Sequence, residues 1–382
     1  MPSLPFAVPE SVDPASTIAA GTIVGGQYQI LELIASGGMG YIYKAVQHPS
    51  GRHVAVKVMR SRLMRDATAI KRFRAEAKAA AQLSHRNSIT LFDFGESNGL
   101  LYMAMEWLDG PNLGTLVTKY GPMSPIRVAR IGTAVARALA DAHEKGIIHR
   151  DLKPENVVLI KGNDDSPYHV KVLDFGIAKM ISGDAQTQIT QLGHVCGTPE
   201  FMSPEQARGD DLDGRSDIYS LGCMLYTLLT TFAPFPGESP MRIVLKHLTE
   251  PFPPLPLETP ELLAATIRRA TQKDPNLRFE DALKMAESLD RFIMSSGLSE
   301  SDPYLQAQNV SENESFFTEI SIPSAVAVSA APTLSLVKPP APLPAEVELE
   351  ESPSSEALRW LITGILAIIA LALLAAVVLQ LL

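Results

Sequence analysis

The chain has 382 residues, a formal net charge of −9 at pH 7 and a hydrophobic content of 46%. The negative net charge argues against nucleic acid as a partner, because binding to a phosphate backbone requires a basic face. Two cysteines cannot form a disulfide framework, so the composition indicates a reducing compartment. The length suffices for a two-lobed domain with additional segments.

The first part of the chain is predicted to be rich in β-structure. Residues 1–26 contain many Pro, Ala and Ser residues and are expected to form a disordered tail. An Ala-rich stretch with interspersed charges predicts a helix over residues 66–83. Alternating apolar residues predict strands at residues 28–34, 41–46, 53–59, 89–94 and 100–106.

From residue 109 onward the pattern becomes helical. Helices are predicted by apolar residues at helical spacing over residues 124–145, 217–229, 241–248, 260–271 and 279–294. Residues 296–357 then shift in composition to Pro, Ser and Glu with few aromatic residues. Such a segment cannot bury enough apolar surface to fold alone, so we expect a linker there.

The last part of the chain is apolar. No charged residue interrupts positions 361–379. At about 1.5 Å per residue, this run and its flanks can cover a hydrocarbon core of about 30 Å, so residues 358–380 are predicted to form a transmembrane helix. The nearby basic residues Lys338 and Arg359 favour a cytoplasmic location for the long preceding part. The first residues lack the features of a secretory signal, so we expect a single-pass, tail-anchored membrane protein.

Two short motifs carry the strongest chemical signal. Residues 149–156 read HRDLKPEN and residues 174–176 read DFG. Within them, Asp151 can hold an attacking hydroxyl group, and Lys153 can neutralise a transferring phosphoryl group. Asn156 and Asp174 offer the hard oxygen ligands that magnesium prefers. A turn-capping role for Asp151 would not explain why the other three residues occur at these spacings.

With three further motifs, these residues resemble those of serine/threonine protein kinases, especially the eukaryotic-like kinases of bacteria. The motifs follow in the order of that family: a Gly-rich loop at 34–40, VAVK at 54–57, HRD at 149–151, DFG at 174–176 and SPE at 203–205. The likeness runs from about residue 28 to about residue 292. It implies an α+β, bilobal kinase domain over residues 27–295, with a small β-rich N-lobe to residue 108 and a larger helical C-lobe from residue 109.

The resemblance implies an ATP site between the lobes. Its Gly-rich loop would comprise Ile34, Ala35, Ser36, Gly37, Gly38, Met39 and Gly40, with Ala35 replacing the first glycine of the family. Lys57 would contact the α- and β-phosphates and pair with Glu76. The adenine would lie among Ile34, Ile42, Ala55, Met105 and Val158, beside the connecting segment of Glu106, Trp107 and Leu108. By itself, the loop is equally consistent with a hairpin turn, and the apolar residues with a plain core.

The same resemblance assigns catalytic and metal-binding roles. Asp151 and Lys153 would be catalytic, and Asn156 and Asp174 would hold Mg²⁺, with Mn²⁺ as the alternative ion. Arg150, next to the catalytic aspartate, suggests control by phosphorylation, because such an arginine pairs with a phosphate on the activation segment.

The activation segment would extend from residue 174 to residue 205. Its candidate phosphorylation sites are Thr187 and Thr190. Supporting roles are implied for four further residues. Thr198 would bond to the catalytic aspartate and lysine, Glu205 would form a buried ion pair with Arg278, and Asp217 would brace the catalytic loop.

The sequence therefore predicts a membrane-associated signalling kinase that uses ATP to phosphorylate Ser or Thr hydroxyls of proteins and its own activation segment. Its expected partners are protein substrates, the lipid bilayer and a second copy for trans-autophosphorylation, with no nucleic acid. A pseudokinase would lack the lysine, the catalytic acid or the metal-binding acid, all of which are present. A kinase for small molecules is disfavoured by the complete segment 197–205. A membrane-tethered scaffold with a partner-binding linker is the remaining alternative.

Overall fold

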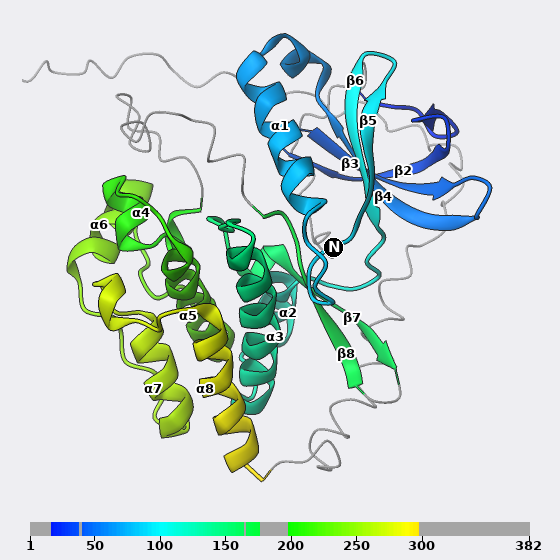
Figure 1. Cartoon of the computed structure of the whole chain (residues 1–382). Helices are drawn as coiled ribbons and strands as arrows, with labels where there is room; N and C mark the ends of the chain where they lie inside the picture. Colours follow the sequence, from blue (N-terminus) through cyan, green and yellow to red (C-terminus); the bar gives the residue numbers. More distant parts are fainter. Residues whose placement is uncertain (1–16, 38–39, 164–165, 176–197, 298–382) are drawn as a thin grey trace, which may run out of the picture. The chain divides into compact units, whose positions relative to one another are not determined.

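The computed structural model describes residues 17–37, 40–163, 166–175 and 198–297. In this part of the chain, a six-stranded sheet with the helix α1 precedes a mainly helical region (Figure 1). The predicted order of a β-rich N-lobe followed by a helical C-lobe is confirmed.

The N-lobe sheet has the strand order β1-β2-β3-β4-β6-β5, and all neighbouring strands are antiparallel. Its strands are β1 (Ile23–Val24), β2 (Tyr28–Ser36), β3 (Gly40–Gln47), β4 (Arg52–Met59), β5 (Leu91–Ser97) and β6 (Leu100–Glu106). The 3₁₀ helix η2 (Ser61–Arg65) and the helix α1 (Ala67–Ala80) follow β4. The carboxylate of Asp66 caps α1 by accepting hydrogen bonds from the N–H groups of Thr68 and Ala69, at 2.9 and 3.2 Å.

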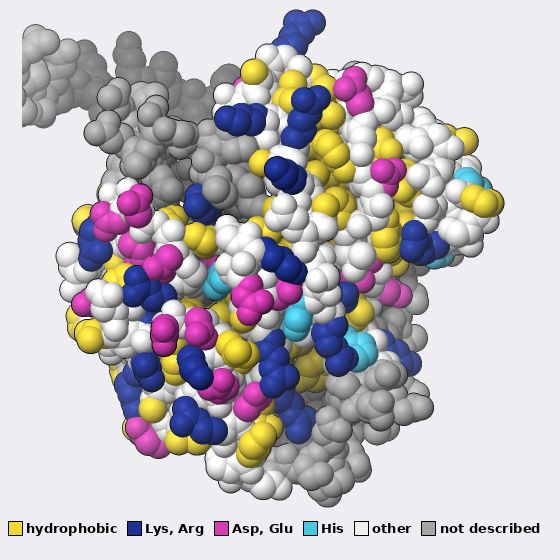
Figure 2. Space-filling model, in the orientation of Figure 1, with side chains coloured by type: hydrophobic (Ala, Val, Ile, Leu, Met, Phe, Trp, Pro, Cys, Tyr) yellow, Lys and Arg dark blue, Asp and Glu magenta, His cyan; other side chains and the backbone are white. Residues whose placement is uncertain are grey.

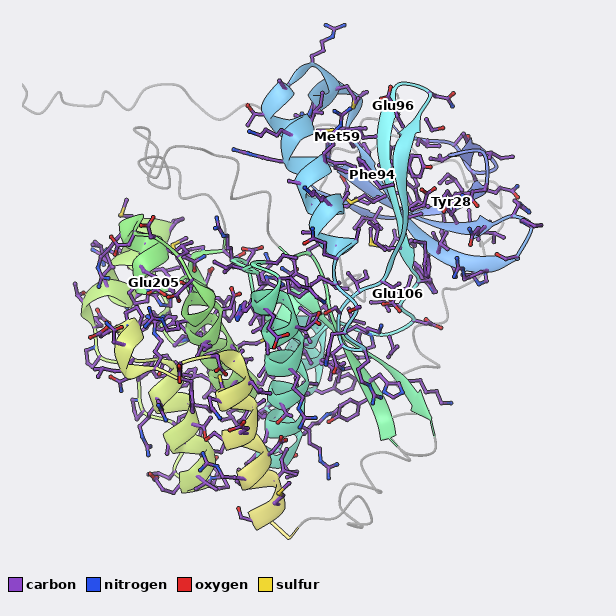
Figure 3. The ribbon with its side chains drawn as sticks, viewed as in Figure 1. Tyr28, Met59, Phe94, Glu96, Glu106 and Glu205 are labelled. Atoms are coloured by element: carbon purple, nitrogen blue, oxygen red, sulfur yellow. The ribbon has the colours of Figure 1, made fainter. Side chains whose placement is uncertain are left out.

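The two faces of this sheet belong to separate apolar clusters, because successive side chains of a strand point to opposite faces. One cluster contains Tyr28 of β2 and Val56 of β4. The other contains Met59 of β4 together with Phe73 of α1. Figure 3 labels Tyr28 and Met59, one residue from each cluster. Lys57 lies two residues before Met59, so the same alternation directs its side chain toward α1.

The C-lobe contains seven helices and one hairpin among the described residues. The helices are α2 (Leu113–Tyr120), α3 (Pro125–Glu144), α4 (Pro204–Arg208), α5 (Gly214–Thr230), α6 (Pro240–Thr249), α7 (Glu261–Ala270) and α8 (Ala282–Ser295). The hairpin consists of β7 (Val157–Asn163) and β8 (Ser166–Val172). Three 3₁₀ helices complete the lobe: η3 (Pro154–Asn156), η5 (Pro199–Phe201) and η6 (Pro275–Leu277).

Helices α3 and α5 form the centre of the C-lobe. α3 contacts both α5 and α8, and α5 also contacts α7. The close packing of α3 requires a glycine at position 132. A Cβ atom there would lie 2.9 Å from a methyl carbon of Leu289 and 3.0 Å from one of Leu225. This packed centre fixes the start of α5, where the buried residue Asp217 lies.

Charged side chains are unevenly distributed over the surface. Residues 60–86, which include η2 and α1, contain eight Lys or Arg and two Asp or Glu. Figure 2 shows Lys and Arg side chains over α1, whereas the C-lobe in the same view mixes both signs. The net charge of −9 therefore arises from the rest of the chain.

The structure differs from the sequence-based expectations mainly in short elements. Residues 17–26 are not part of a disordered tail: β1 pairs with β2, and the N–H group of Ile18 donates to the Tyr43 hydroxyl group at 2.9 Å. A two-residue strand has no detectable periodicity, which explains the error. The helix α2 and the hairpin β7–β8 were not predicted, and α5 begins at Gly214, three residues before the predicted start.

Several expectations lie outside the described residues. These are the tail up to residue 16, the linker from residue 298 onward and the transmembrane helix at 358–380. Among the residues that are described, no helix has the length and hydropathy needed to cross a membrane.

Replacing Phe73 by Ala is expected to lower the free energy of unfolding by about 3–5 kcal/mol, because a large cavity would form between α1 and the sheet. Urea denaturation followed by the fluorescence of Trp107 measures the change. The control is Phe232→Ala: Phe232 is 73% exposed, and its loss is expected to change stability by no more than about 0.5 kcal/mol. Equal effects of the two substitutions would contradict the assignment of Phe73 to the core.

Candidate active site

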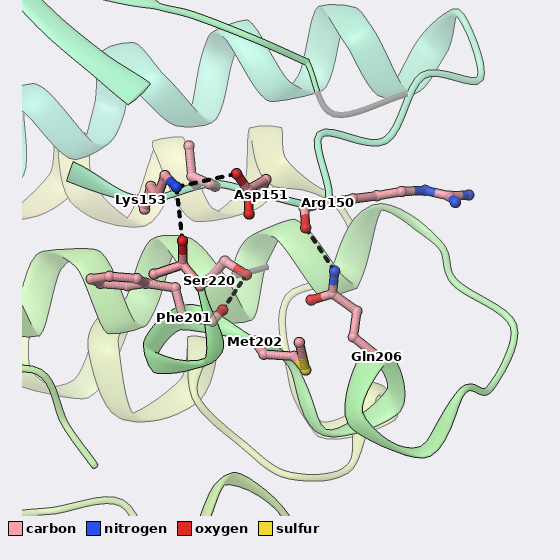
Figure 4. Close-up of a pocket in the computed structure, with 9 residues that line it drawn as sticks. Arg150, Asp151, Lys153, Phe201, Met202, Gln206 and Ser220 are labelled. Carbon is pink, nitrogen blue, oxygen red and sulfur yellow. Dashed lines mark hydrogen bonds and ion pairs between the residues drawn. The ribbon is translucent and has the colours of Figure 1, made fainter. Parts of the chain in front are cut away.

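The catalytic loop between α3 and β7 places Asp151 and Lys153 close to each other and to Thr198 (Figure 4). The Lys153 ammonium group lies 3.4 Å from a carboxylate oxygen of Asp151 and donates a hydrogen bond to the Thr198 hydroxyl group at 2.7 Å. The side-chain amide of Asn156 donates to the backbone carbonyl of Asp151 at 2.8 Å. This bond uses the nitrogen of the amide, so the amide oxygen of Asn156 remains available to a cation.

Asp217 holds this loop from the start of α5. One of its carboxylate oxygens accepts from the N–H group of His149 at 2.8 Å, and the other from the N–H group of Arg150 at 2.9 Å. His143 contacts the first oxygen at 2.8 Å. Burial alone would raise the pKa of Asp217, but the bond to His143 and the surrounding donors bring it below its ordinary value. The carboxylate is therefore ionised and braces the loop, as expected.

The backbone of the catalytic loop is strained at Arg150. Its φ angle is 63°, in the left-handed region that costs a residue with a β-carbon about 1–3 kcal/mol. The side-chain amide of Gln206 donates to the Arg150 carbonyl at 2.9 Å (Figure 4), and Asp217 accepts from its N–H group. Both peptide groups around Arg150 are thus fixed by buried side chains, which offsets the strain.

His149 links the catalytic loop to the DFG motif. Its ring nitrogen Nε2 lies 2.9 Å from the carbonyl of Leu173, and its ring lies 4.8 Å from that of Phe175. Because a carbonyl can only accept, Nε2 must carry the proton. Burial lowers the pKa of His149, which agrees with a neutral ring. Asp174, between these two partners, has a φ angle of 40°, a second strained position at the site.

Lys57 faces two carboxylates. It forms an ion pair with Glu76 of α1, and its ammonium group lies 3.6 Å from an oxygen of Asp174. Burial opposes both charges: it raises the pKa of Glu76 and by itself would lower that of Lys57. The two carboxylates more than compensate at Lys57, whose pKa lies above its ordinary value. We therefore assign the charged form to this lysine.

The Gly-rich loop connects β2 and β3, as predicted. Ala35 is paired with Ile42, and Ser36 with Tyr41, in the ladder between the two strands. Ala35 therefore lies within β2, directly after an irregularity of the ladder between Leu33 and Ala35, and its φ angle is not in the left-handed region that favours glycine. Gly40 is required, because a Cβ atom there would lie 2.4 Å from the Val58 carbonyl oxygen.

The apolar residues of the predicted adenine pocket are brought together only in part. Ile42, Ala55, Met105 and Leu108 belong to the cluster next to α1. Val158, buried in β7, and Ile34, half-buried in β2, are not members of this cluster. Gly38 and Met39 of the loop, like Thr187 and Thr190, lie outside the described residues.

Glu106 has a contact that the sequence did not reveal. Its carboxylate accepts from the Lys171 ammonium group and from the N–H group of Thr90, each at 2.7 Å. Its own N–H group donates to the Thr90 carbonyl at 3.0 Å. Lys171 was missed, although it is an isolated lysine between two valines, as Lys57 is.

The end of the activation segment is fixed by the predicted ion pair of Glu205 and Arg278. Two nitrogens of the guanidinium group donate to the two carboxylate oxygens at 2.6 and 2.8 Å. Both side chains are buried, and Ser216 donates to the same carboxylate at 2.7 Å. A cavity of about 10 Å³, with room for about one water molecule, separates this segment from the catalytic loop (Figure 4).

The donor set is consistent with magnesium. Among the described residues, no three His, Cys, Asp or Glu side chains are grouped as in a complete metal cage. Magnesium binds through one or two protein oxygens together with phosphates and water, so a cage is not required. Asn156 and Asp174 supply oxygens of the appropriate kind, and Asp174 is placed near the lysine that would contact the phosphates.

Comparisons with known proteins identify the family. The model of the protein kinase domain matches residues 28–288. Serine/threonine-protein kinase pkn3 of Myxococcus xanthus is 44% identical over 262 residues, which cover 67% of this chain and 48% of that protein. Serine/threonine-protein kinase PknB of Mycolicibacterium smegmatis is 42% identical over 273 residues, which cover 69% of this chain and 43% of that protein. The crystal structure of the Mycobacterium tuberculosis PknI kinase domain matches with a TM-score of 0.55 and 28% identity, covering 72% of this chain and 98% of that one.

The chain therefore belongs to the protein kinase family, and the prediction of a kinase domain of the serine/threonine type is confirmed. The match spans less than half the length of the two curated relatives.

The Glu205–Arg278 pair is expected to make a pH-dependent contribution to stability. Burial alone would raise the pKa of Glu205, but the hydrogen bonds and charge of Arg278 hold it below its ordinary value of 4.5. The contribution is thus complete above about pH 4.5 and is lost as the pH falls through the lower pKa of the folded state.

Denaturation of the wild type and of Glu205→Gln at pH 7 and at decreasing pH measures this contribution. The two stabilities should converge as the pH falls. At pH 7, Arg278→Ala is expected to cost about 3–5 kcal/mol, because a buried carboxylate loses its partner. Arg137→Ala is the control, since its pair with Asp290 is partly exposed and is expected to contribute about 1 kcal/mol or less. A pH-independent difference would contradict the assigned pKa.

Proposed function

We propose that this chain is a serine/threonine protein kinase that transfers the γ-phosphate of ATP to Ser and Thr hydroxyls of proteins. The observation that carries the proposal is the convergence of Asp151, Lys153 and Thr198 on one side, with Lys57, held by Glu76, near Asp174 on the other. The names of the related proteins pkn3 and PknB agree with this specificity.

In the proposed reaction, Asp151 accepts the hydrogen bond of the substrate hydroxyl group and finally its proton. The hydroxyl oxygen bonds to the γ-phosphorus while the bond from that phosphorus to the β-phosphate oxygen breaks, leaving ADP. Lys153 balances the negative charge on the transferring group, and its bond to Thr198 fixes its position. Lys57 binds the α- and β-phosphates. Mg²⁺ or Mn²⁺ bound by Asn156 and Asp174 would neutralise phosphate charge.

The pseudokinase alternative is disfavoured by the geometry. The ion pair between Lys57 and Glu76 requires α1 to lie close to the sheet, which is the arrangement that a kinase needs for transfer. Asp151 and Asp174 are both present, and His149 contacts the N–H group of Asp151 and the carbonyl of Leu173, the residue before Asp174. A protein that only binds partners has no need for this arrangement.

We further propose that activity is regulated by autophosphorylation in trans. Arg150 lies beside the catalytic aspartate and would pair with a phosphate on Thr187 or Thr190. Two copies of the chain would have to meet, because the segment of one kinase must enter the cleft of another. A homodimer is therefore the proposed assembly for activation.

The membrane location is also part of the proposal. The apolar run at 358–380 supports a single transmembrane helix, with the kinase domain on the cytoplasmic side and residues 296–357 as its tether. In the scaffold alternative, this tether would bind partners, which a pull-down with residues 296–357 alone would detect.

Replacing Asp151 by Asn is expected to lower the rate of phosphate transfer about 10²–10⁴-fold, because the base of the reaction is lost. Lys57→Met is expected to abolish measurable transfer. Incorporation of labelled phosphate from ATP with Mg²⁺ into a Ser/Thr protein substrate measures both. Asp290→Asn, on the partly exposed face of α8, is the control and should retain the wild-type rate. Equal incorporation by all variants would refute the proposal, and mapping of the labelled residues tests Thr187 and Thr190.

The full chain is expected to remain with the membrane fraction after washing at alkaline pH. Replacing Leu366 and Leu373 by Lys should release it, because each charge near the middle of a membrane helix costs about 2.5–3.5 kcal/mol. Replacing the same residues by Ile is the matched control. Release of the wild-type chain by alkaline washing would contradict the proposed anchor.

A further inference from the structure

Arg60 connects the two sides of the Gly-rich loop. It follows β4 directly, and its guanidinium group donates three hydrogen bonds to this region. Nε donates to the Gly37 carbonyl at 2.8 Å, Nη2 to the Ser36 hydroxyl at 2.7 Å and Nη1 to the Tyr41 hydroxyl at 2.9 Å. Ser36 and Gly37 precede the tip of the loop, and Tyr41 follows it.

The guanidinium group of Arg60 packs on a buried aromatic ring. Its central carbon lies 4.4 Å from the centre of the Tyr41 ring, which is almost fully buried. A planar guanidinium group can stack on an aromatic ring while it donates from three separate nitrogens, whereas an ammonium group donates from a single nitrogen. Among the described residues, no carboxylate forms an ion pair with Arg60.

This arrangement restricts the loop in two ways. The three bonds join β2 and β3 at the point where their ladder ends, which limits the freedom of the loop before a nucleotide binds. They also engage the carbonyl oxygen of Gly37, a partial negative charge that would repel phosphate if it turned toward the site. A loop whose two ends are held in place loses less conformational entropy on binding its ligand.

We propose that Arg60 is a positioning residue for the nucleotide phosphates: it holds the two ends of the Gly-rich loop, at Ser36, Gly37 and Tyr41, without itself contacting the reacting atoms. The inference rests on the proposed use of ATP by this site. It predicts that loss of Arg60 weakens the binding of nucleotides with phosphates but leaves the binding of the base and sugar alone unchanged.

The test compares the binding of Mg·ADP and of adenosine to the detergent-solubilised full chain by calorimetry. For Arg60→Gln, the Kd of Mg·ADP is expected to rise about tenfold, which corresponds to about 1.4 kcal/mol. The Kd of adenosine and the kcat at saturating ATP should each stay within about twofold of the wild-type values. This change is much smaller than the roughly tenfold rise expected for the Kd of Mg·ADP. Arg60→Lys should restore only a small part of the affinity, because one ammonium group cannot serve all three acceptors.

The matched control is Arg62→Gln, which removes an exposed arginine two residues away and should leave both Kd values unchanged. Tyr41→Phe keeps the stacking ring and removes one acceptor, so its effect should be smaller. The double variant Arg60→Gln with Tyr41→Phe should be no weaker than Arg60→Gln alone, because the two residues act through one contact. Additive losses would contradict the proposed contact.

Two further results would overturn the proposal. An equal loss of affinity for Mg·ADP and adenosine would indicate a general defect of the N-lobe. Full rescue by Arg60→Lys would indicate that the positive charge, and not the three hydrogen bonds, supports nucleotide binding. If Arg60→Gln does not fold, Ser36→Ala and Tyr41→Phe provide the same comparison. A wild-type chain that fails to bind Mg·ADP would instead refute the proposed function itself.

Discussion

The bonds from Asp217 to the catalytic loop are the constraint on which the site depends. They connect α5, a largely buried helix of the C-lobe, to the backbone of His149 and Arg150. Arg150 is thereby held in a left-handed conformation, and this turn determines where the next residue, Asp151, is placed. Without a buried acceptor for both N–H groups, the strained backbone would relax, and the carboxylate of Asp151 would lose its position relative to Lys153.

The charged groups around Lys57 also depend on how buried side chains are paired. Lys57 is faced by two carboxylates, those of Glu76 and Asp174, so this part of the site carries an excess of one negative charge. A lysine alone cannot accommodate additional phosphates under these conditions. A divalent cation reverses the local sign, which explains why a kinase site needs metal and nucleotide together.

The sequence predicted the larger features because each depends on a local pattern. Alternation located most strands of the N-lobe, and the VAVK motif in β4 located Lys57. The pairing of Glu205 with Arg278 was predicted across 73 residues, but only through the family resemblance. Ala35 can replace the first glycine of the family because this position lies within β2 and not in a turn. No local pattern in the sequence could reveal this.

Other contacts could not be predicted because they depend on how distant segments meet. Arg60 looks like one of several surface cations in a basic stretch, and only the antiparallel pairing of β3 with β4, in which Gly40 lies opposite Met59, brings the loop to it. The two residues of β1 are too few to show a period, and their strand exists only through pairing with β2. Lys171 carried a usable signal, but its partner Glu106 belongs to another strand.

The contact between Glu106 and Lys171 joins β6 of the N-lobe to β8 of the C-lobe. Glu106 is fixed on one side by the backbone of Thr90 and on the other by an ammonium group from β8. Trp107 and Leu108, which follow, pack against the apolar cluster next to α1, and the Lys44 ammonium group lies 4.8 Å from the centre of the Trp107 ring. A change in the orientation of β8 relative to the N-lobe sheet would therefore have to stretch or break the ion pair between Glu106 and Lys171.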